Sequence, residues 1–592
     1  MGALARPAGD RDLTARGGRA VRVAGAAAFA AATVALFVVS RGRWSDVLVD
    51  SGREWIVPDA LSRGERLYRD VVYWFGPFTP CLHAVFFRVL GSSFSTLVTA
   101  GVVGSLGVLA ALFFALSTVT GRREAVLWTA LAVPALVFMP GAGGSILGMG
   151  YRIWHAAAFA LAALAVVLRP DAVRRPWSPA LAGALAALAG LCRTEWGLAT
   201  LAVAGVVVFQ RANGRNGVRA QELRLLAAFL LVFGGVFAVF GLRAGWPSFT
   251  RDAPVLLLNV PAETRSHPIL SGVSGWRDGI WTLLYSMAMW TGVFFLVEIA
   301  ALARGDPSRA RRRLAPLAVV LLVLALAAWR GGGSSGGLIW SAAPLACAAA
   351  CVVGLSSGRH RAAAALTGFG ALGLLLSHRR LFFIEDGPYV GPPLLFAFVA
   401  AAALCSIAVG REASAPFRER WGTGIAMALV LLIGAAFAAR FAEYGTDERV
   451  RIPGTGGFLS ARPELAREIE GLAAAIRSSS RSTDGLVVFP EGEILNYLSG
   501  RRNPIRHKLY LPGYIDERNE PEILRELRVA PPAAVVIWRR PLGEYGAGLF
   551  GEDYAREIRR WIGESYDRAR FRPNASARPS ELEYYLRKVS AR

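Results

Sequence analysis

The residues from Val49 to Pro80 read VDSGREWIVPDALSRGERLYRDVVYWFGPFTP. They follow the first long apolar run, Val21 to Ser40, by about ten residues, and they include five acids in a chain that is otherwise apolar and rich in arginine. Charged groups are costly to hold beside lipid. A charged loop next to a first membrane helix is therefore a candidate functional site.

Composition predicts a membrane protein. Of the 592 residues, 54% are hydrophobic, and the mean hydropathy is +0.41. Only 18% are charged, below the roughly 25% that is usual in soluble domains. Apolar runs of about 15 to 24 residues, the length range of bilayer-spanning helices, recur up to Arg440. The run after Arg22 is longer than the apolar region of a typical signal peptide.

The net charge of +23 does not indicate a nucleic-acid partner. Residues 1–440 hold about 41 arginines and 21 acids, whereas residues 441–592 hold 25 basic and 22 acidic groups. The surplus lies in short loops between apolar runs, where positive charge marks the cytosolic side of a membrane. Because most bases are arginine and Ala and Gly are abundant, the composition is typical of a GC-rich bacterial genome.

Apolar runs separated by arginine clusters predict an all-α polytopic protein of about thirteen spans. The N-terminus lies in the cytosol and the tail outside the plasma (inner) membrane. The organisation is a basic N-terminus at 1–20, a membrane domain at 21–440 with a first outer loop at 41–95, and an outer segment at 441–592. The spans are 21–40, 96–119, 124–140, 153–168, 179–192, 196–210, 225–243, 279–303, 315–329, 338–355, 362–377, 391–409 and 422–440. If 179–192 and 196–210 were one span, the tail would lie inside.

The segment after Phe441 differs from the rest of the chain. Its pattern predicts strands at 485–489 and 534–538 and helices at 493–499 and 553–565. We therefore expect a small extracytoplasmic α/β domain at the C-terminus.

Asp50 and Glu54 are the first pair of groups that could carry chemistry. At a spacing of four residues, two carboxylates share a helix face. One of them could deprotonate an acceptor hydroxyl while the other binds a metal or orients the substrate. The alternative is that both are solvated loop acids paired with Arg53 and Arg43.

The order of residues in this loop resembles a known family. An outer loop after the first membrane helix contains D-x-G-R-E from Asp50 to Glu54, then G-x-x-L-Y-R-D from Gly64 to Asp70, then Tyr73 and Gly76-Pro77. This resembles the GT-C superfamily of polytopic glycosyltransferases, and most closely its dolichyl-phosphate-mannose protein mannosyltransferase and RgtA/B/C/D-like branch.

The resemblance implies transfer of a hexosyl or pentosyl group, with inversion, from a polyprenyl-phosphate donor to an extracytoplasmic acceptor, which is a glycan, a lipid or a protein. It implies that Asp50 is the catalytic acid, and that Tyr68 and Asp70 belong to the substrate-binding segment. In the commonest version of the pattern a second acid follows at once. Here Ser51 follows and Glu54 is the next acid, and Asp46 remains an alternative base.

A phosphate leaving group requires a cation, and the arginine fork suits two phosphate oxygens. The candidates for substrate binding are Arg53, Arg152, Arg193, Arg379 and Arg380. Arg193 could instead form a structural ion pair with Glu195, and the 379–380 pair could anchor the chain at the membrane interface. No metal-ligand spacing is present and no cofactor is implied, although a divalent metal at the acids stays open.

In the tail, Asn496, Gly500, Arg501 and Asn503 lie in VVFPEGEILNYLSGRRNP, from Val487 to Pro504. They either pack the domain or contact the acceptor. Two rival functions stay open for the whole chain. An O-antigen ligase or polymerase would carry its key arginines and histidines in a late outer loop, and a transporter or flippase of lipid-linked glycans would show broken helices and repeats.

Overall fold

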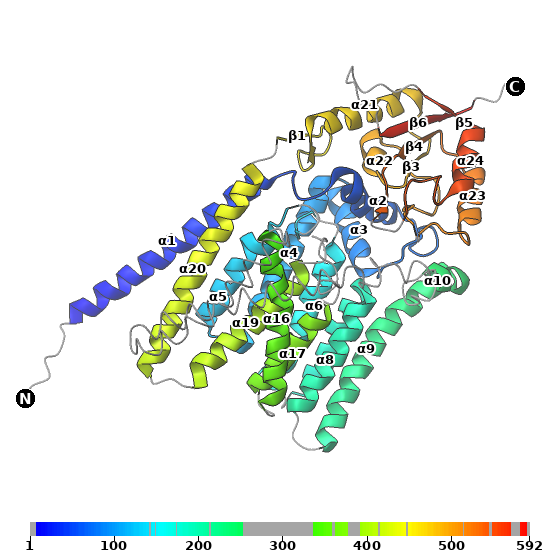
Figure 1. Cartoon of the computed structure of the whole chain (residues 1–592). Helices are drawn as coiled ribbons and strands as arrows, with labels where there is room; N and C mark the ends of the chain where they lie inside the picture. The colour runs from blue at the N-terminus through cyan, green and yellow to red at the C-terminus, as the bar shows by residue number, and fades with distance from the viewer. Residues whose placement is uncertain are drawn as a thin grey trace, which may run out of the picture.

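The structure is a computed structural model that describes residues 8–140, 144–147, 150–172, 175–211, 215–252, 335–357, 361–376, 391–411, 415–445, 448–512, 514–543, 547–569 and 581–588. Within these ranges, the regular elements up to Gly445 are helical, and strands and helices are mixed beyond it (Figure 1). The predicted spans 279–303 and 315–329 lie outside the described residues, as do Arg379 and Arg380.

The helical part begins with a long helix and a short irregular region that corresponds to the first predicted loop. Its elements are α1 (Ala8–Ser40), the π-helical turn η1 (Val47–Ser51), α2 (Gly52–Ser62), α3 (Phe78–Leu90), α4 (Phe94–Val119), α5 (Arg122–Ala132), η2 (Val133–Val137), α6 (Tyr151–Leu168), α7 (Trp177–Cys192), α8 (Thr194–Arg211), α9 (Arg215–Ala244), α10 (Trp246–Asp252), α16 (Ser335–Ser356), α17 (Arg361–Leu376), α19 (Gly391–Arg411) and α20 (Ala415–Gly445).

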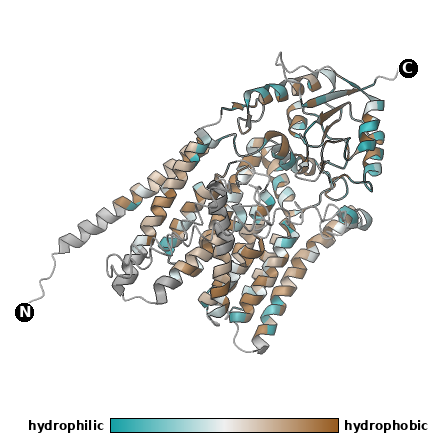
Figure 2. Ribbon diagram, viewed as in Figure 1, coloured by the Kyte–Doolittle hydropathy of each residue, from teal (hydrophilic) through white to brown (hydrophobic). Residues whose placement is uncertain are grey.

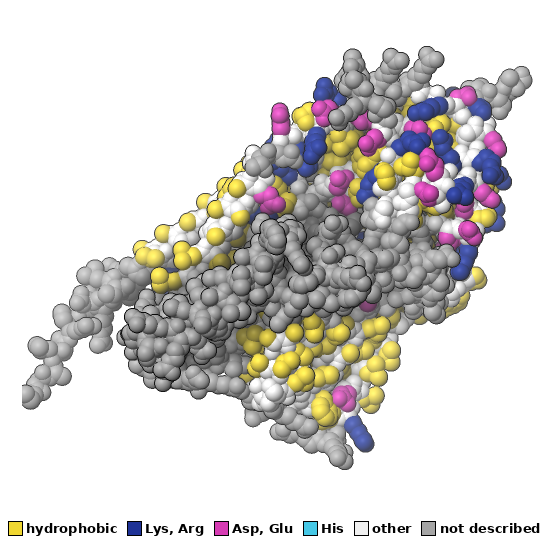
Figure 3. Space-filling view, in the orientation of Figure 1, with side chains coloured by type: hydrophobic (Ala, Val, Ile, Leu, Met, Phe, Trp, Pro, Cys, Tyr) yellow, Lys and Arg dark blue, Asp and Glu magenta, His cyan; other side chains and the backbone are white. Residues whose placement is uncertain are grey.

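Five described helical stretches are long and apolar enough to cross a membrane: Ala20–Ser40, Phe94–Val119, Tyr151–Leu168, Val218–Ala244 and Thr423–Gly445. Apolar residues dominate these helices, whereas charged side chains gather over the C-terminal part of the molecule (Figures 2 and 3). The protein is an integral membrane protein. The count of thirteen spans and the side on which each loop lies stay predictions.

The membrane helices pack around α6, whose apolar window is 83% buried, whereas the corresponding windows of α1 and α20 are each 11% buried. Alanine-rich faces allow close approach, and α6 contacts α4, α7 and α8. The region 179–210 forms two helices, as predicted. α7 ends at Cys192 and α8 begins at Thr194, with Arg193 in extended backbone between them.

The C-terminal part is built on a four-stranded mixed sheet of order β3-β4-β6-β5. β3 and β4 are parallel, whereas β6 is antiparallel to both β4 and β5. The two strands and two helices predicted here are present, as β3, β4, α22 and α24. The bounds are β1 (Val450–Arg451), β2 (Ser460–Ala461), α21 (Pro463–Ser479), β3 (Leu486–Phe489), α22 (Ile494–Ser499), α23 (Glu520–Val529), β4 (Ala534–Trp538), α24 (Arg556–Ser565), β5 (Tyr566–Arg568) and β6 (Leu582–Arg587).

The first loop and the C-terminal part pack against each other. α2 contacts α22 (Figure 1), and backbone hydrogen bonds join the two parts at Ser460 N to Gly42 O (3.0 Å) and at Val72 N to Arg506 O (3.1 Å). The same apolar core contains residues of both, including Leu48 and Val488. The candidate site therefore lies between segments more than four hundred residues apart in sequence.

Candidate active site

A tight turn at the start of η1 positions Asp50. Asp46 accepts hydrogen bonds at its Oδ1 from the backbone N–H groups of Leu48 and Val49, both at 2.9 Å, and its carbonyl accepts from Asp50 N. This capping commits one oxygen of the exposed Asp46 carboxylate to the fold. Asp50, at the end of the turn, is only 3% exposed.

Gly52 explains how the C-terminal part comes so close. A Cβ at this position would lie 2.3 Å from Ile494 N and 2.6 Å from the carbonyl carbon of Glu493. Only glycine permits the backbone of α2 to reach the backbone that leads into α22. The glycine of the D-x-G-R-E motif thus brings the acids of the P-E-G-E sequence, 490–493, next to those of the loop.

Glu491 ties the two segments together. It is fully buried, and Arg53 donates to its Oε1. Arg540 approaches its other oxygen at 2.7 Å. Two guanidinium groups therefore compensate one desolvated carboxylate, which a buried charge requires. Arg53, predicted to bind substrate, contacts the C-terminal part in this way.

Asp50 and Glu493 are buried acids with spare acceptor atoms. Within the described part of the chain, Asp50 Oδ1 and Glu493 Oε1 have no hydrogen-bond partner. Burial raises the pKa of Asp50 to about 7 and that of Glu493 to about 8, and the positive charge of Arg53 opposes both shifts. Such groups exchange a proton near neutral pH, which suits general acid–base chemistry.

Glu54 lies on the other side of the same cluster. Its Oε1 is 3.4 Å from Arg152 Nη1, and both side chains are buried. Burial raises the pKa of Glu54 to about 7, against the nearby charges of Arg152 and Arg53. A small cavity beside this pair is lined by Arg53, Glu54, Val57, Pro58, Tyr73, Thr79, Pro80, His83, Arg152 and Leu509.

The interpretation of Asp50 and Glu54 as solvated loop acids is wrong, because both side chains are buried. Arg43, their proposed partner, instead donates to the backbone carbonyl of Tyr444. The positive charge of Arg53 lowers the pKa of both acids, but the ion pair of Arg53 is with Glu491.

Phe75 links three residues that the sequence singled out. The guanidinium carbon of Arg152 lies 3.7 Å from the centre of its ring, and that of Arg193 lies 5.9 Å from it. Tyr68 is fully buried and donates its hydroxyl to the Phe75 carbonyl at 2.8 Å. Arg193 also pairs with Glu195 at 2.6 Å, as the structural alternative predicts.

Gly76 fixes this arrangement, because a Cβ there would lie 1.9 Å from the carbonyl oxygen of Leu191. The first loop thereby rests on the end of α7, two residues before Arg193. The Gly76-Pro77 pair of the motif is thus explained by a close backbone contact.

Other candidates lie apart from the cluster. Asp70 is half-exposed, accepts from Arg66 N at 2.9 Å and lies 3.7 Å from Arg69. In the tail, Asn496 donates to the Leu486 and Arg501 carbonyls, and Gly500 adopts the left-handed conformation that ends α22. The side chains of Arg501 and Asn503 likewise bond to backbone groups around them. These contacts favour packing over acceptor binding for these tail residues.

Sequence reasoning missed Phe75, Glu491, Glu493 and Arg540. The available signal was the pair of acids in P-E-G-E directly after an apolar strand, where burial is expected. Among the described residues, no group of three or more His, Cys, Asp or Glu side chains is arranged to hold a metal ion.

No family model and no curated protein sequence matches the chain. Among solved structures, it is similar to ArnT from Cupriavidus metallidurans bound to undecaprenyl phosphate, with a TM-score of 0.48 and 13% identity over 96% of this chain and 98% of that one. It is similar to the oligosaccharyltransferase AglB from Archaeoglobus fulgidus in complex with an inhibitory peptide and a dolichol-phosphate, with a TM-score of 0.40 and 12% identity over 86% and 69%. It is also similar to the arabinofuranosyltransferase AftD from Mycobacteria, with a TM-score of 0.40 and 14% identity over 95% of this chain and 40% of that one.

Proposed function

We propose that this protein is a membrane glycosyltransferase of the GT-C type. It transfers a sugar from a polyprenyl-phosphate donor to a hydroxyl of an extracytoplasmic acceptor, and Asp50 is the general base. The proposal is carried by one observation: the buried Asp50 carboxylate keeps an oxygen without a hydrogen-bond partner among the described residues, within the electrostatic influence of Arg53. The resemblance of the loop motif supports the same residue.

Asp50 is suited to the step by its proton affinity. With a pKa of about 7 it is substantially ionised at neutral pH and still basic enough to accept a proton. The acceptor oxygen would attack the anomeric carbon as the bond from that carbon to the donor's phosphate oxygen breaks. The hydroxyl proton passes to Asp50, and the polyprenyl phosphate leaves as an anion. Asp46 is the weaker candidate because its carboxylate caps the turn.

The phosphate would be held by arginine. Arg152 stands at the small cavity beside Glu54, and Arg193 lies on the same Phe75 ring. Protonation of Glu54, whose pKa is about 7, would remove the carboxylate charge that competes with phosphate oxygens for Arg152. Arg53, held by Glu491, contributes a fixed positive charge behind the acids.

The test is Asp50→Asn in purified protein supplied with radiolabelled polyprenyl-phosphate sugars and a membrane-envelope extract as acceptor source. We expect transfer to fall by about 10²- to 10⁴-fold, the usual contribution of a general base, while the protein stays folded and inserted. In the wild type the rate should rise with pH as Asp50 loses its proton near pH 7. Undiminished consumption of the donor by the Asn variant would overturn the assignment, and movement of intact donor across the bilayer without transfer would favour a flippase.

A further inference from the structure

A second polar cavity extends along α2 from Trp55 to Arg63, and neither Asp50 nor Glu54 lines it. It encloses about 240 Å³ between α2, Ser92 and the C-terminal residues 496–508. Four cations and one carboxylate line it: Arg63, Arg501, Arg502, Lys508 and Asp59. A second hollow of about 440 Å³ adjoins it and shares Arg502, Asn503 and Lys508.

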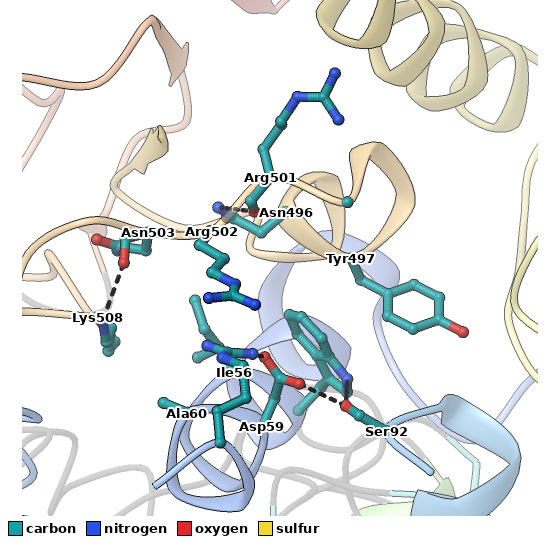
Figure 4. A pocket seen from close by; sticks show the side chains of 13 residues that line it. Ile56, Asp59, Ala60, Ser92, Asn496, Tyr497, Arg501, Arg502, Asn503 and Lys508 are labelled. Carbon is teal, nitrogen blue, oxygen red and sulfur yellow. Dashed lines mark hydrogen bonds and ion pairs between the residues drawn. The ribbon is translucent and has the colours of Figure 1, made fainter. Parts of the chain in front are cut away.

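Asp59 offsets one of the four positive charges, that of Arg63, and three cations remain in the lining. One oxygen accepts the Ser92 hydroxyl at 2.7 Å, and the other pairs with Arg63. Ser92 in turn accepts the indole N–H of Trp55 at 2.9 Å. Figure 4 shows the contact between Asp59 of α2 and Ser92.

Two of the four cations, Arg501 and Lys508, are held by contacts within the protein. Arg501 points away from the cavity (Figure 4) and donates to the carbonyls of Ser499 and Ser480. Lys508 is buried, donates to Asn503 O and Ile505 O at 3.1 and 2.7 Å, and has Glu65 at 3.5 Å. Both groups are therefore fixed by the protein.

Arg502 is the exception. Its side chain is exposed and extends toward α2 (Figure 4), and among the described residues no carboxylate lies within ion-pair distance of it. Its charge and that of Arg63 repel each other. Arg63 is paired with Asp59 and with Glu65 at 3.3 Å, so Arg502 is the cation facing this cavity whose charge no described acid balances, and a bound anion would supply that balance.

From this geometry we infer that the cavity between α2 and residues 496–508 is a subsite for a carboxylate or phosphate group carried on the acceptor. The inference rests on the proposed function, because it assigns this anion to the acceptor. The donor phosphate is a poor occupant: Glu54 and Arg63 are nine residues apart, roughly 13 Å along α2. One phosphate cannot contact both ends of the helix.

Acidic monosaccharides provide a direct test. Glucuronic acid and glucose 6-phosphate, with glucose as the neutral probe, would be titrated against the full-length protein in nanodiscs of neutral lipid, by calorimetry or saturation-transfer NMR. We expect Arg502→Gln to weaken binding of both acidic probes by about tenfold to a hundredfold, since hydrogen bonds to charged groups are lost. Arg502→Lys should lie between, and Arg518→Gln, an exposed arginine outside both cavities, should bind as the wild type.

The inference is overturned if Arg502→Gln binds the acidic probes as tightly as the wild type, or if glucose binds as well as glucuronic acid. It is also overturned if the probes bind weakly and phosphatidylglycerol in the nanodiscs occupies the site while phosphatidylcholine does not. The ligand would then be an anionic lipid headgroup and not the acceptor. Asp50→Asn should retain binding of the acidic probes. The transfer rate of Asp50→Asn therefore tests the proposed catalysis, and probe binding by Arg502→Gln tests the subsite, so that either proposal can fail without the other.

Discussion

Two buried carboxylates in this protein, Glu583 and Asp50, have hydrogen-bond donors around them to very different degrees. Glu583 in β6 is 4% exposed. One oxygen has Arg568 at 3.2 Å and Arg539 at 3.7 Å, and the other has Arg559 at 3.4 Å and the Tyr585 hydroxyl at 2.8 Å. Both oxygens are thus matched by donors, as buried acids in a folded core generally are.

Asp50 is just as buried, yet its Oδ1 has no partner among the described residues. The nearest cation that affects it, Arg53, forms its ion pair with Glu491. The fold therefore holds one carboxylate as a structural ion and the other as a group that still lacks hydrogen bonds. The unsatisfied oxygen, and not burial alone, therefore distinguishes Asp50 from Glu583, and Glu493 shares this feature with Asp50.

The largest expected effect separates the two carboxylates by activity. Asp50→Asn should reduce sugar transfer by about 10²- to 10⁴-fold, whereas Glu583→Gln should leave the transfer rate within about twofold, because the β6 cluster acts only on the fold. Initial rates with a radiolabelled polyprenyl-phosphate sugar provide the measurement. A comparable loss in both variants would end the distinction between a reactive and a structural acid.

The helices and the site differ in how far they follow from sequence. The apolar runs at 96–119 and 153–168 match α4 and α6 to within a few residues, because polar groups, glycine or proline stand at their ends. Asp50, Arg53 and Glu54 could be found together because they are close in sequence.

The long-range partners could not be found in this way. Glu54 meets Arg152 across 98 residues, and Arg53 meets Glu491 across 438. The Arg53–Glu491 pair depends on the docking of the C-terminal part onto α2, and the Glu54–Arg152 pair depends on the placement of α2 beside α6. Periodicity and composition encode neither arrangement. A single sequence shows acids that follow an apolar strand at 490–493, but not which loop they face.

The second effect is on the free energy of unfolding, which Asp50→Asn should raise and Glu583→Gln should lower. Raising the pKa of Asp50 from 3.8 to about 7 means that the folded state binds a proton more tightly than the unfolded state. Stability from this group is present below pH 4 and is lost as pH rises toward 7. At about 1.36 kcal/mol per pKa unit, Asp50→Asn should be more stable than the wild type at pH 8, by on the order of 2–4 kcal/mol.

Thermal unfolding of the Asp50→Asn and wild-type proteins in detergent at pH 5 and pH 8 tests this sign. The variant's advantage in stability should be larger at pH 8 than at pH 5, because more of the wild-type Asp50 is ionised at pH 8. Glu54 and Glu493 titrate in both proteins, so their contributions cancel in the comparison. If the variant were less stable than the wild type at pH 8, Asp50 would be a satisfied structural ion like Glu583.

The third effect concerns Glu583 in β6, both of whose carboxylate oxygens have hydrogen-bond donors. Glu583→Gln removes a carboxylate from three arginines and a tyrosine, so we expect a loss of about 1–3 kcal/mol in the free energy of unfolding. The exposed Glu564→Gln at the end of α24 is the matched control and should change stability by less than about 0.5 kcal/mol. Equal stability of the two variants would show that the β6 cluster is solvated enough to lose its acid without cost.

The smallest effect concerns Asp70, an acid of a third kind, which the loop motif places with the substrate and the structure places at the surface. Its pair with Arg69 spans 3.7 Å and both side chains are substantially exposed, so Asp70→Asn should cost less than about 1 kcal/mol of stability. By the same criterion we expect the transfer rate of Asp70→Asn to fall by less than about tenfold, since Asp70 is half-exposed and accepts the Arg66 N–H. A loss as large as that of Asp50→Asn would mean that an exposed acid acts on substrate directly, and that an unsatisfied buried oxygen is not what identifies a working carboxylate in this loop.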